Sequence, residues 1–291
     1  MNACLRTISI LLALLFAGPL SAQPGFSHSL DDYEFQPARA PSNRVVHYLK
    51  SNLDGTRPMV ISIYFAAPLK LEVLKVEADG QYLALVAAEI DPASMTETLM
   101  RSYKQLEQGT PRLQMSLRGE KQARRLVASV AKAELPVEPG HLPAHVYNFD
   151  LTGLNATLPH LKNPRRDFEV GIVDPDFQFL AKQFKPDGGV QQGGMVYKGK
   201  ARFRYLKDEL LDEVPCLRYE VGGPAFQDIK GSLWINARDG LIERFEHALP
   251  DNPQWSSFKL SRIGARPMDL AGWDRFKAAT VQRAMDLRDA D

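Results

Sequence analysis

Two side chains in residues 231–250 are the main candidates for chemistry in this chain. Glu243 and His247 follow the turn pair Asp239-Gly240 and stand four residues apart on a predicted extended segment. Residues i, i+2 and i+4 of a strand share one face, so the carboxylate and the imidazole would point the same way. A carboxylate in such a place can act as a general acid or base. Glu243 is therefore a candidate catalytic group, and Glu243 with His247 are candidate polar groups of a binding cavity.

The register of this predicted hairpin decides what the two side chains face. With a loop at residues 238–240 and Gly240 in the left-handed conformation, the strands pair outward from the loop. The expected pairs are Ala237–Leu241, Ile235–Glu243 and Leu233–Phe245, with Leu249 on the same face and Trp234, Ile242 and Arg244 on the other. Glu243 and His247 then share an apolar face, where an unpaired carboxylate is costly. Either the register differs, or the two lie at the rim, or they face a cavity.

Other candidate groups lack the partners that catalysis or metal binding needs. Asp174 and Asp176 lie on one side of an extended chain, and we expect a loop at a strand end there. His141 and His145 have the spacing of metal ligands on a helix, yet Pro143 and its neighbours oppose a helix. No nucleophile elbow, zinc-protease, paired-cysteine or phosphate-loop motif occurs. We expect no catalytic residue, no metal and no cofactor.

Four cations form the one unbalanced strip in the chain. Lys198, Lys200, Arg202 and Arg204 alternate with aromatic and small residues. On a strand this alternation places all four on one face. The strip is either a solvated outer face or a contact for an anionic head group, a polysaccharide or a membrane surface.

The first 22 residues have the layout of a secretory signal. Arg6 precedes an apolar run from Ile8 to Phe16, and small residues end at Ala22. The run is shorter than the roughly 20 residues that span a bilayer, and no other candidate span occurs. We expect cleavage near Ala22 and a soluble, periplasmic mature chain. Because the whole chain carries +1 and Arg6 is the sole charge of the signal, the mature chain is neutral. Binding nucleic acid needs a basic excess, so nucleic acid is excluded as a partner.

Removal of the signal leaves Cys216 as the single cysteine. One cysteine cannot form an internal disulfide, so the fold must depend on its apolar core. Cys216 lies in an apolar run and is expected to be buried as a small hydrophobic residue.

Most of the chain has the pattern of an antiparallel sheet. Asp-Gly pairs separate apolar runs, as in successive hairpins. Apolar and polar residues alternate from Leu69, and the alternation changes phase between Val73 and Leu74. This change predicts a β-bulge and a curved sheet.

Helical spacing appears in three places. A capped helix is predicted from Asp91-Pro92 to Gly109, a short one over residues 151–161, and a C-terminal one after Asp269. The C-terminal stripe consists of Leu270, Trp273, Phe276, Thr280, Ala284 and Leu287.

The fold class follows from these elements: α+β and mostly β, a curved antiparallel sheet or unclosed β-barrel with a few covering helices. The expected organisation is a signal peptide at 1–22, a loosely ordered lead-in at 23–43, one curved-sheet domain at 44–268 and a C-terminal amphipathic helix at 269–291.

Residues 196–263 add a resemblance to a known family. The strand Val214 to Val221, the strand "GSLWIN", the turn Asp239-Gly240 and the returning "LIERFE" resemble the periplasmic lipoprotein-carrier superfamily. This group includes the LolA- and LolB-like proteins and uncharacterised periplasmic relatives. The resemblance implies an unclosed barrel whose helices cover an apolar concavity. In characterised members that concavity takes up acyl chains.

Three functions remain open at this point. The first is an exported, non-catalytic binding protein for an apolar or amphipathic, lipid-like ligand between the sheet and its helices. An open apolar face in water costs roughly 25 cal/mol per Å², so a concavity must hold side chains, a helix or a ligand. The candidate ligand contacts are Leu233, Ile235, Phe245, Glu243, His247, Trp273 and Phe276. The alternatives are an exported hydrolase acting on cell-envelope material, with Glu243 as acid or base, and a structural envelope scaffold whose concavity is filled by the Trp273 and Phe276 stripe.

Overall fold

The computed structural model describes residues 27–28, 30–80, 83–105, 111–120, 124–130, 133–146, 151–175, 195–249 and 255–288. The predicted signal sequence and Asp176 lie outside these ranges. The strands are β1 (Ser27–His28), β2 (Arg44–Ser51), β3 (Met59–Ala67), β4 (Lys70–Glu77), β5 (Leu83–Asp91), β6 (Thr96–Gln105), β7 (Pro111–Glu120), β8 (Arg125–Val130), β9 (Ala133–Val137), β10 (His141–Leu142), β11 (Ala144–Val146), β12 (Phe168–Pro175), β13 (Met195–Leu211), β14 (Val214–Gly222), β15 (Gly231–Asn236), β16 (Ile242–Ala248) and β17 (Ser257–Pro267). The helices are α1 (Thr152–Thr157) and α3 (Leu270–Arg288), with the 3-10 turns η1 (Leu30–Asp32), η3 (Leu158–His160) and η4 (Pro224–Phe226).

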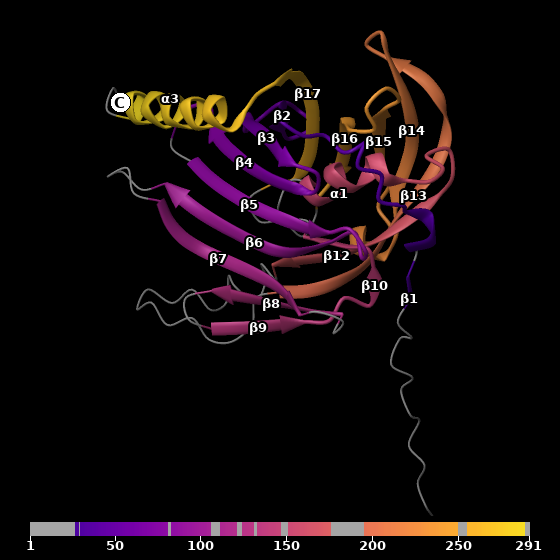
Figure 1. Ribbon diagram of the computed structural model, residues 1–291. Coiled ribbons are helices and arrows are strands. Elements are labelled where there is room, and N and C mark those ends of the chain that lie inside the picture. The colour runs from indigo at the N-terminus through magenta and orange to yellow at the C-terminus, as the bar shows by residue number, and fades with distance from the viewer. Residues whose placement is uncertain are drawn as a thin grey trace, which may run out of the picture.

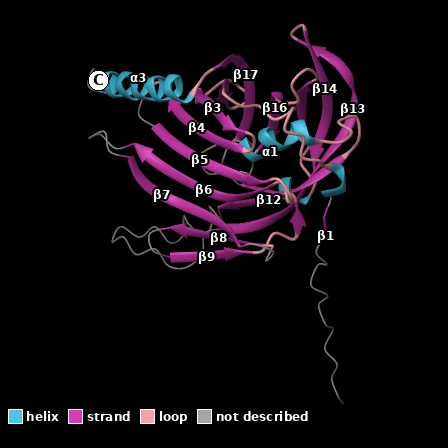
Figure 2. Ribbon diagram, viewed as in Figure 1, coloured by secondary structure: helices cyan, strands magenta, loops and turns pink. Residues whose placement is uncertain are grey.

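One curved sheet organises the fold. Its order is β11-β12-β13-β14-β15-β16-β17-β2-β3-β4-β5-β6-β7-β8-β9, and β1 pairs separately with β10. Neighbouring strands of the large sheet are antiparallel except the pair β11 and β12. The sheet curls around α1 and does not close, while strands make up most of the ribbon (Figures 1 and 2). The prediction of a mostly β, α+β fold with an unclosed curved sheet is confirmed.

Strand β11 pairs with β12 along one edge, and side chains of β6 bond the amides of its other edge. The amide of Ala144 donates to Thr96 Oγ1 at 2.9 Å, and that of Val146 donates to Glu97 Oε1 at 3.4 Å. Edge amides need such partners because unpaired backbone groups are costly when buried. The seam between β11 and β6 therefore depends on two polar side chains of β6.

The sheet is apolar on both faces over β2 to β5. The inner face carries the large core, which on β4 includes Leu71 and Val73. The outer face of the same strand contributes Leu74 and Val76 to a second cluster. The β-bulge predicted between Val73 and Leu74 is wrong, because β4 pairs regularly with β3 and β5 through these residues. The phase change in the sequence marks burial of both faces instead.

Helix α3 covers the outer face, as Figure 1 shows. Asp269 caps it, since its Oδ1 accepts from the amide of Gly272 at 2.7 Å. Trp273 is fully buried and stacks on Tyr64 with ring centroids 5.2 Å apart. The predicted C-terminal helix is confirmed, and its buried stripe packs against the outside of the sheet.

Helix α1 and η3 fill the concavity on the inner face. The prediction of a short helix over residues 151–161 is confirmed. Every residue of α1 is buried, and Leu154, Leu158 and Leu161 belong to the large core. A helix this short is unstable alone, and it has no side-chain cap, so the surrounding sheet must hold it.

The helix predicted from Asp91 to Gly109 is wrong. Residues 96–105 form strand β6. Asp91 does cap a turn, because its Oδ2 accepts from the amide and hydroxyl of Ser94 at 3.0 and 2.7 Å, but the turn leads into a strand. Met95 has a positive φ of 49°, which ends the turn before a helix can form.

The lead-in packs against the rest of the molecule from Leu30 onward, in contrast to the loose order expected of it. Tyr33 is 5% exposed and bridges to Leu161, and the amide of Glu34 donates to the carbonyl of His160 at 2.9 Å. These contacts place residues 38–44 beside η3, where they form one wall of the site described below.

Candidate functional site

The hairpin of β15 and β16 has a different register from the predicted one near its turn. Leu233 lies opposite Phe245 as predicted, but Ile235 lies opposite Ile242, with a bulge that leaves Glu243 as the extra residue. Gly240 is left-handed as expected, with φ of 72°. The predicted Ala237–Leu241 pair is wrong, because the amide of Asn236 donates to the carbonyl of Leu241 at 2.8 Å.

The bulge has a cause on α1. Asn155 Oδ1 accepts from the amide of Ile242 at 2.9 Å, and Asn155 Nδ2 donates to Tyr48 Oη at 2.9 Å. Tyr48 Oη donates in turn to the carbonyl of Ile242 at 2.9 Å. Both backbone groups of Ile242 are thus bonded by side chains from α1 and β2, and Ile242 is turned into the core. The prediction that Ile242 shares a face with Trp234 and Arg244 is therefore wrong.

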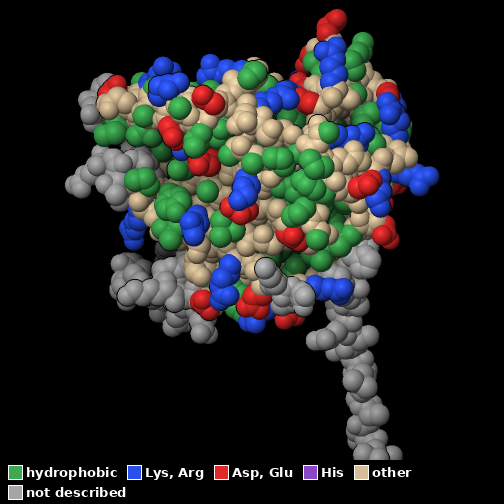
Figure 3. Space-filling model, viewed as in Figure 1, with side chains coloured by type: hydrophobic (Ala, Val, Ile, Leu, Met, Phe, Trp, Pro, Cys, Tyr) green, Lys and Arg blue, Asp and Glu red, His purple; other side chains and the backbone are tan. Residues whose placement is uncertain are grey.

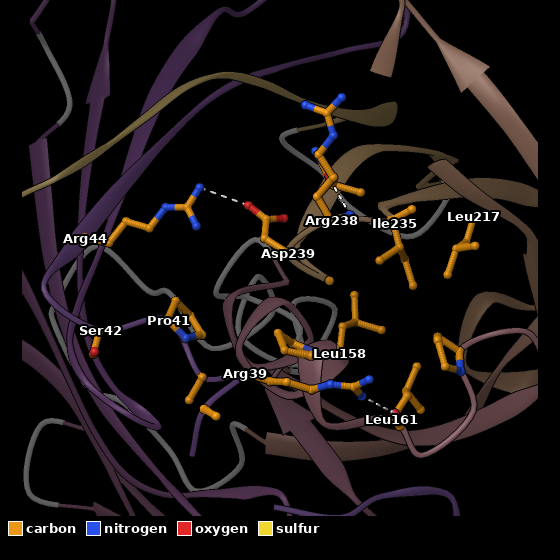
Figure 4. Close-up of a pocket in the computed structure, with 17 residues that line it drawn as sticks. Arg39, Pro41, Ser42, Arg44, Leu158, Leu161, Leu217, Ile235, Arg238 and Asp239 are labelled. Atoms are coloured by element: carbon orange, nitrogen blue, oxygen red, sulfur yellow. Dashed lines mark hydrogen bonds and ion pairs between the residues drawn. The ribbon is translucent and has the colours of Figure 1, made fainter. Parts of the chain in front are cut away.

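A cavity of about 460 Å³ lies where the lead-in, η3 and the hairpin turn meet. We call it the η3 pocket. Its walls are residues 38–42 with Arg44, residues 158–159 with Leu161 and Pro164, Leu217, and residues 235–240. Figure 4 shows these groups around the opening. Its volume lies within the usual range for small-molecule sites, roughly 300–1,000 Å³.

A network of charges positions one wall of the η3 pocket. Asp239 Oδ2 accepts from Arg44 Nη2 at 2.9 Å and from Arg262 Nη2 at 2.9 Å (Figure 4 shows the first pair). Glu243 Oε2 accepts from Asn236 Nδ2 at 2.9 Å and lies 3.6 Å from Arg262 Nη1. Burial acts to lower the pKa of the Arg262 guanidinium, but the bond to Asp239 holds this pKa above its usual value. The hairpin turn is thereby tied to β2 and β17.

Gly240 fixes how closely the turn approaches η3. A Cβ at Gly240 would lie 2.9 Å from Pro159 Cα, and its backbone is left-handed. Both conditions favour glycine. The turn and η3 therefore form adjoining walls of the η3 pocket.

Glu243 and His247 do not form a catalytic pair within this geometry. Glu243 is bonded to Asn236 and close to Arg262, and it does not line the η3 pocket. His247 is buried and its Nε2 is 2.9 Å from the carbonyl oxygen of Ile229. Its ring packs 4.4 Å from that of Phe226. Both side chains have structural partners, and the hydrolase that rested on Glu243 gains no support.

The other predicted ligand contacts divide between two faces of the sheet. Leu233, Ile235 and Phe245 belong to the inner core, and Ile235 also lines the η3 pocket. Trp273 belongs to the outer cluster, and Phe276 packs against that cluster. The idea that Trp273 and Phe276 fill the concavity is wrong, because α1 and η3 fill it instead. The seven predicted contacts do not form one site.

The basic strip on β13 lies beside carboxylates. Glu169 accepts from Lys200 Nζ at 2.5 Å and from Arg202 Nε at 2.9 Å, and Arg204 pairs with Glu220 at 3.0 Å. Lys198 Nζ lies 3.8 Å from Asp174 Oδ2. Burial acts to raise the pKa of Glu169, but the two cations hold it below its usual value. On the face shown in Figure 3, cationic and anionic side chains are interspersed.

The histidines and the cysteine are buried in separate places. His141 and His145 lie on β10 and β11, each about 2% exposed. Cys216 is buried as predicted, and burial, with Glu243 and Glu209 nearby, raises the pKa of its thiol to about 11. A thiol of that pKa is a poor nucleophile. Within the described ranges, no three His, Cys, Asp or Glu residues gather as a metal site would require.

No protein-family model matches the chain, and no curated protein matches it in sequence. Solved structures with a similar fold include the following two. The β-barrel-like protein of domain of unknown function DUF1849 from Brucella abortus has 8% identity and a TM-score of 0.41, over 78% of this chain and 98% of that chain. A domain from Vibrio parahaemolyticus described as an outer membrane lipoprotein-sorting protein has 11% identity and a TM-score of 0.20, over 79% and 87%. Likeness this weak carries no argument about function.

Neither described helix combines the length and the apolar character needed to cross a bilayer.

Sequence reasoning missed the η3 pocket because its walls come from segments far apart in the chain. The composition of the lead-in predicts loose order, and Arg39 and Arg44 belong to no motif. The signal in the sequence is Asp239, a charged residue at the hairpin turn.

Proposed function

We propose that this is an exported, non-catalytic binding protein whose η3 pocket holds one apolar or amphipathic, lipid-like ligand. The observation that carries the proposal is the pocket itself, a cavity of about 460 Å³ that remains although α1 fills the concavity. Leu158, Leu217 and Ile235 give it an apolar floor continuous with the core. Covering this floor with an acyl chain removes apolar surface from water, which is favourable at roughly 25 cal/mol per Å².

Saturable binding of a fluorescent fatty acyl probe to the delipidated chain tests this proposal. We expect one probe per chain. Ala237→Trp on the hairpin and Ala38→Trp on the lead-in should each weaken binding at least tenfold, because the indole occupies the pocket without replacing a core residue. Both alanines are exposed at the pocket wall, so the substitutions should leave folding intact.

Ala279→Trp is the matched control, since Ala279 is exposed on α3, away from the η3 pocket. Its affinity should equal that of the unmodified chain. Equal probe binding by all three variants would place the ligand elsewhere and contradict the proposal.

A structural scaffold is the second candidate, and the filled concavity favours it. Leu151, Leu154 and Leu158 occupy the space that an acyl chain would take in an empty barrel. If the delipidated chain takes up no acyl probe even at high protein concentration, the scaffold is the better account.

A further inference from the structure

The charges around the η3 pocket do not balance. Asp239 and Glu243 are matched by the two guanidiniums they hold, those of Arg44 and Arg262, so this group of four is neutral. Arg39 and Arg238 also line the pocket. Over the described ranges, no carboxylate lies within ion-pair distance of either, which leaves two uncompensated positive charges at the pocket.

These two arginines come from opposite walls. Arg39 belongs to the lead-in, and its Nη1 donates to the carbonyl of Leu161 at 3.3 Å, which holds the side chain along the η3 side of the pocket. Arg238 belongs to the hairpin turn. Figure 4 shows Arg39 beside Leu158 and Leu161, and Arg238 on the opposite side of the pocket with its guanidinium directed away from Leu158. The pocket thus combines an apolar floor with a cationic rim.

We infer, on the basis of the proposed function, that the ligand is an anionic amphiphile whose carboxylate or phosphate head group is attracted to the cationic rim, where Arg39 and Arg238 lie. Guanidinium groups suit these head groups because they form charge-assisted, often paired hydrogen bonds with them. The apolar chain of the ligand covers Leu158 and its neighbours. Asp239 stays bonded to Arg44 and Arg262, so these two guanidiniums are already neutralised.

Three ligands with the same alkyl chain test the head group: a fatty acid, the corresponding fatty alcohol and the corresponding alkyl phosphate. Each is titrated against the full delipidated chain carrying a fluorescent acyl probe. The acid and the phosphate should displace the probe at concentrations at least tenfold lower than the alcohol. Added salt should narrow this difference, because the head group is solvent-exposed and its attraction is screened.

The double variant Arg39→Gln/Arg238→Gln should bring the acid and the phosphate to the affinity of the alcohol and leave the alcohol unchanged. Both side chains are exposed, so stability should change little, which thermal unfolding checks. Arg204→Gln, on the outer face of β13, is the control and should preserve the tenfold difference.

The outcomes separate the two proposals. If the alcohol binds as tightly as the acid, the anionic head group is wrong while the η3 pocket remains a lipid site. If no alkyl ligand displaces the probe, both proposals fail. If inorganic phosphate alone displaces the probe as well as the alkyl phosphate does, the site binds a free anion, and the amphipathic ligand of the proposed function is wrong.

Discussion

Glu97 is a buried carboxyl group at the seam between β6 and β11. It is 2% exposed, its Oε2 has no hydrogen-bond partner among the described residues, and burial raises its pKa to about 8. Gly153 of α1 packs directly on the carboxyl group, since a Cβ there would lie 1.7 Å from Glu97 Oε1. The protonated acid is therefore the form that the folded chain accommodates.

The pH dependence of stability follows from the shifts of three buried groups. The stability that Glu97 contributes is fully present below its ordinary pKa of 4.5, and it is lost as pH rises to about 8. Burial lowers the pKa values of His145 and His160 from 6.5 to about 4, so their contribution is present above pH 6.5 and lost as pH falls toward 4. Between pH 4.5 and 6.5 the two histidines outweigh Glu97. Urea unfolding should give a maximum of stability near pH 6.5.

Glu97→Gln tests the part of this curve above pH 6.5. Because glutamine has no charge to bury, the variant should keep its stability between pH 6.5 and 8 while the unmodified chain loses it. At pH 8 the variant should be more stable by roughly 1–3 kcal/mol, the cost of an unsatisfied buried polar group. A decline of the variant parallel to that of the unmodified chain would rule out Glu97 as the cause.

Asn155→Leu should destabilise the chain by about 2–4 kcal/mol. The substitution keeps the γ-branched shape but leaves the amide of Ile242 and the hydroxyl of Tyr48 without the bonds that Asn155 makes, at roughly 1–3 kcal/mol each. Asn163→Leu, at an exposed position with a local bond to the amide of Arg165, is the matched control and should change stability by less than about 0.5 kcal/mol. Equal stability of both variants in urea would contradict the role assigned to Asn155.

At the scale of elements, α3 stabilises the outer face of the sheet and takes no part in the η3 pocket. Trp273 stacks on Tyr64, and its Nε1 donates to Glu72 Oε2 at 2.6 Å. Trp273→Ala should therefore cost about 3 kcal/mol of stability, the lower end for a buried tryptophan. Acyl-probe affinity, measured where the variant is still folded, should stay unchanged. A selective loss of affinity would return Trp273 to the ligand site.

The sequence allowed the elements to be predicted where a single local rule acts. Asp269 caps a long amphipathic stripe, and α3 forms where that pattern predicts it. Asp91 shows the same capping chemistry, but its turn leads into β6, because pairing with β5 and β7 outweighs helical spacing over so short a run. The phase change at Val73 required knowledge of α3 on the far face, which no local pattern contains.

The site was less predictable than the fold. Leu233 and Phe245 could be paired from the turn alone. The bulge at Glu243 could not, because its cause is Asn155, a residue of α1 far away in the chain. Arg39 and Asp239 meet around one cavity only after the lead-in has packed on η3. Tertiary contacts of this kind leave no period in the sequence.

At the scale of the whole molecule, most of the interior of the curved sheet is packed and a small part is a cavity. Helix α1 and η3 occupy the concavity, and the lead-in leaves a cavity of about 460 Å³ at its edge. Figure 1 shows α1 inside the curve of the sheet and α3 outside it. The ligand site that we propose therefore lies beside η3, at the edge of the filled core and not within it.

The position of a bound acyl chain tests this account most directly. A fatty acid with a photoreactive diazirine near the end of its chain, crosslinked to the delipidated protein and mapped by mass spectrometry, reports the residues that surround it. The account predicts adducts within residues 38–44, 158–164 and 235–240, which an excess of unlabelled fatty acid suppresses. Saturable adducts confined to α3, or to core strands away from these segments, would contradict it.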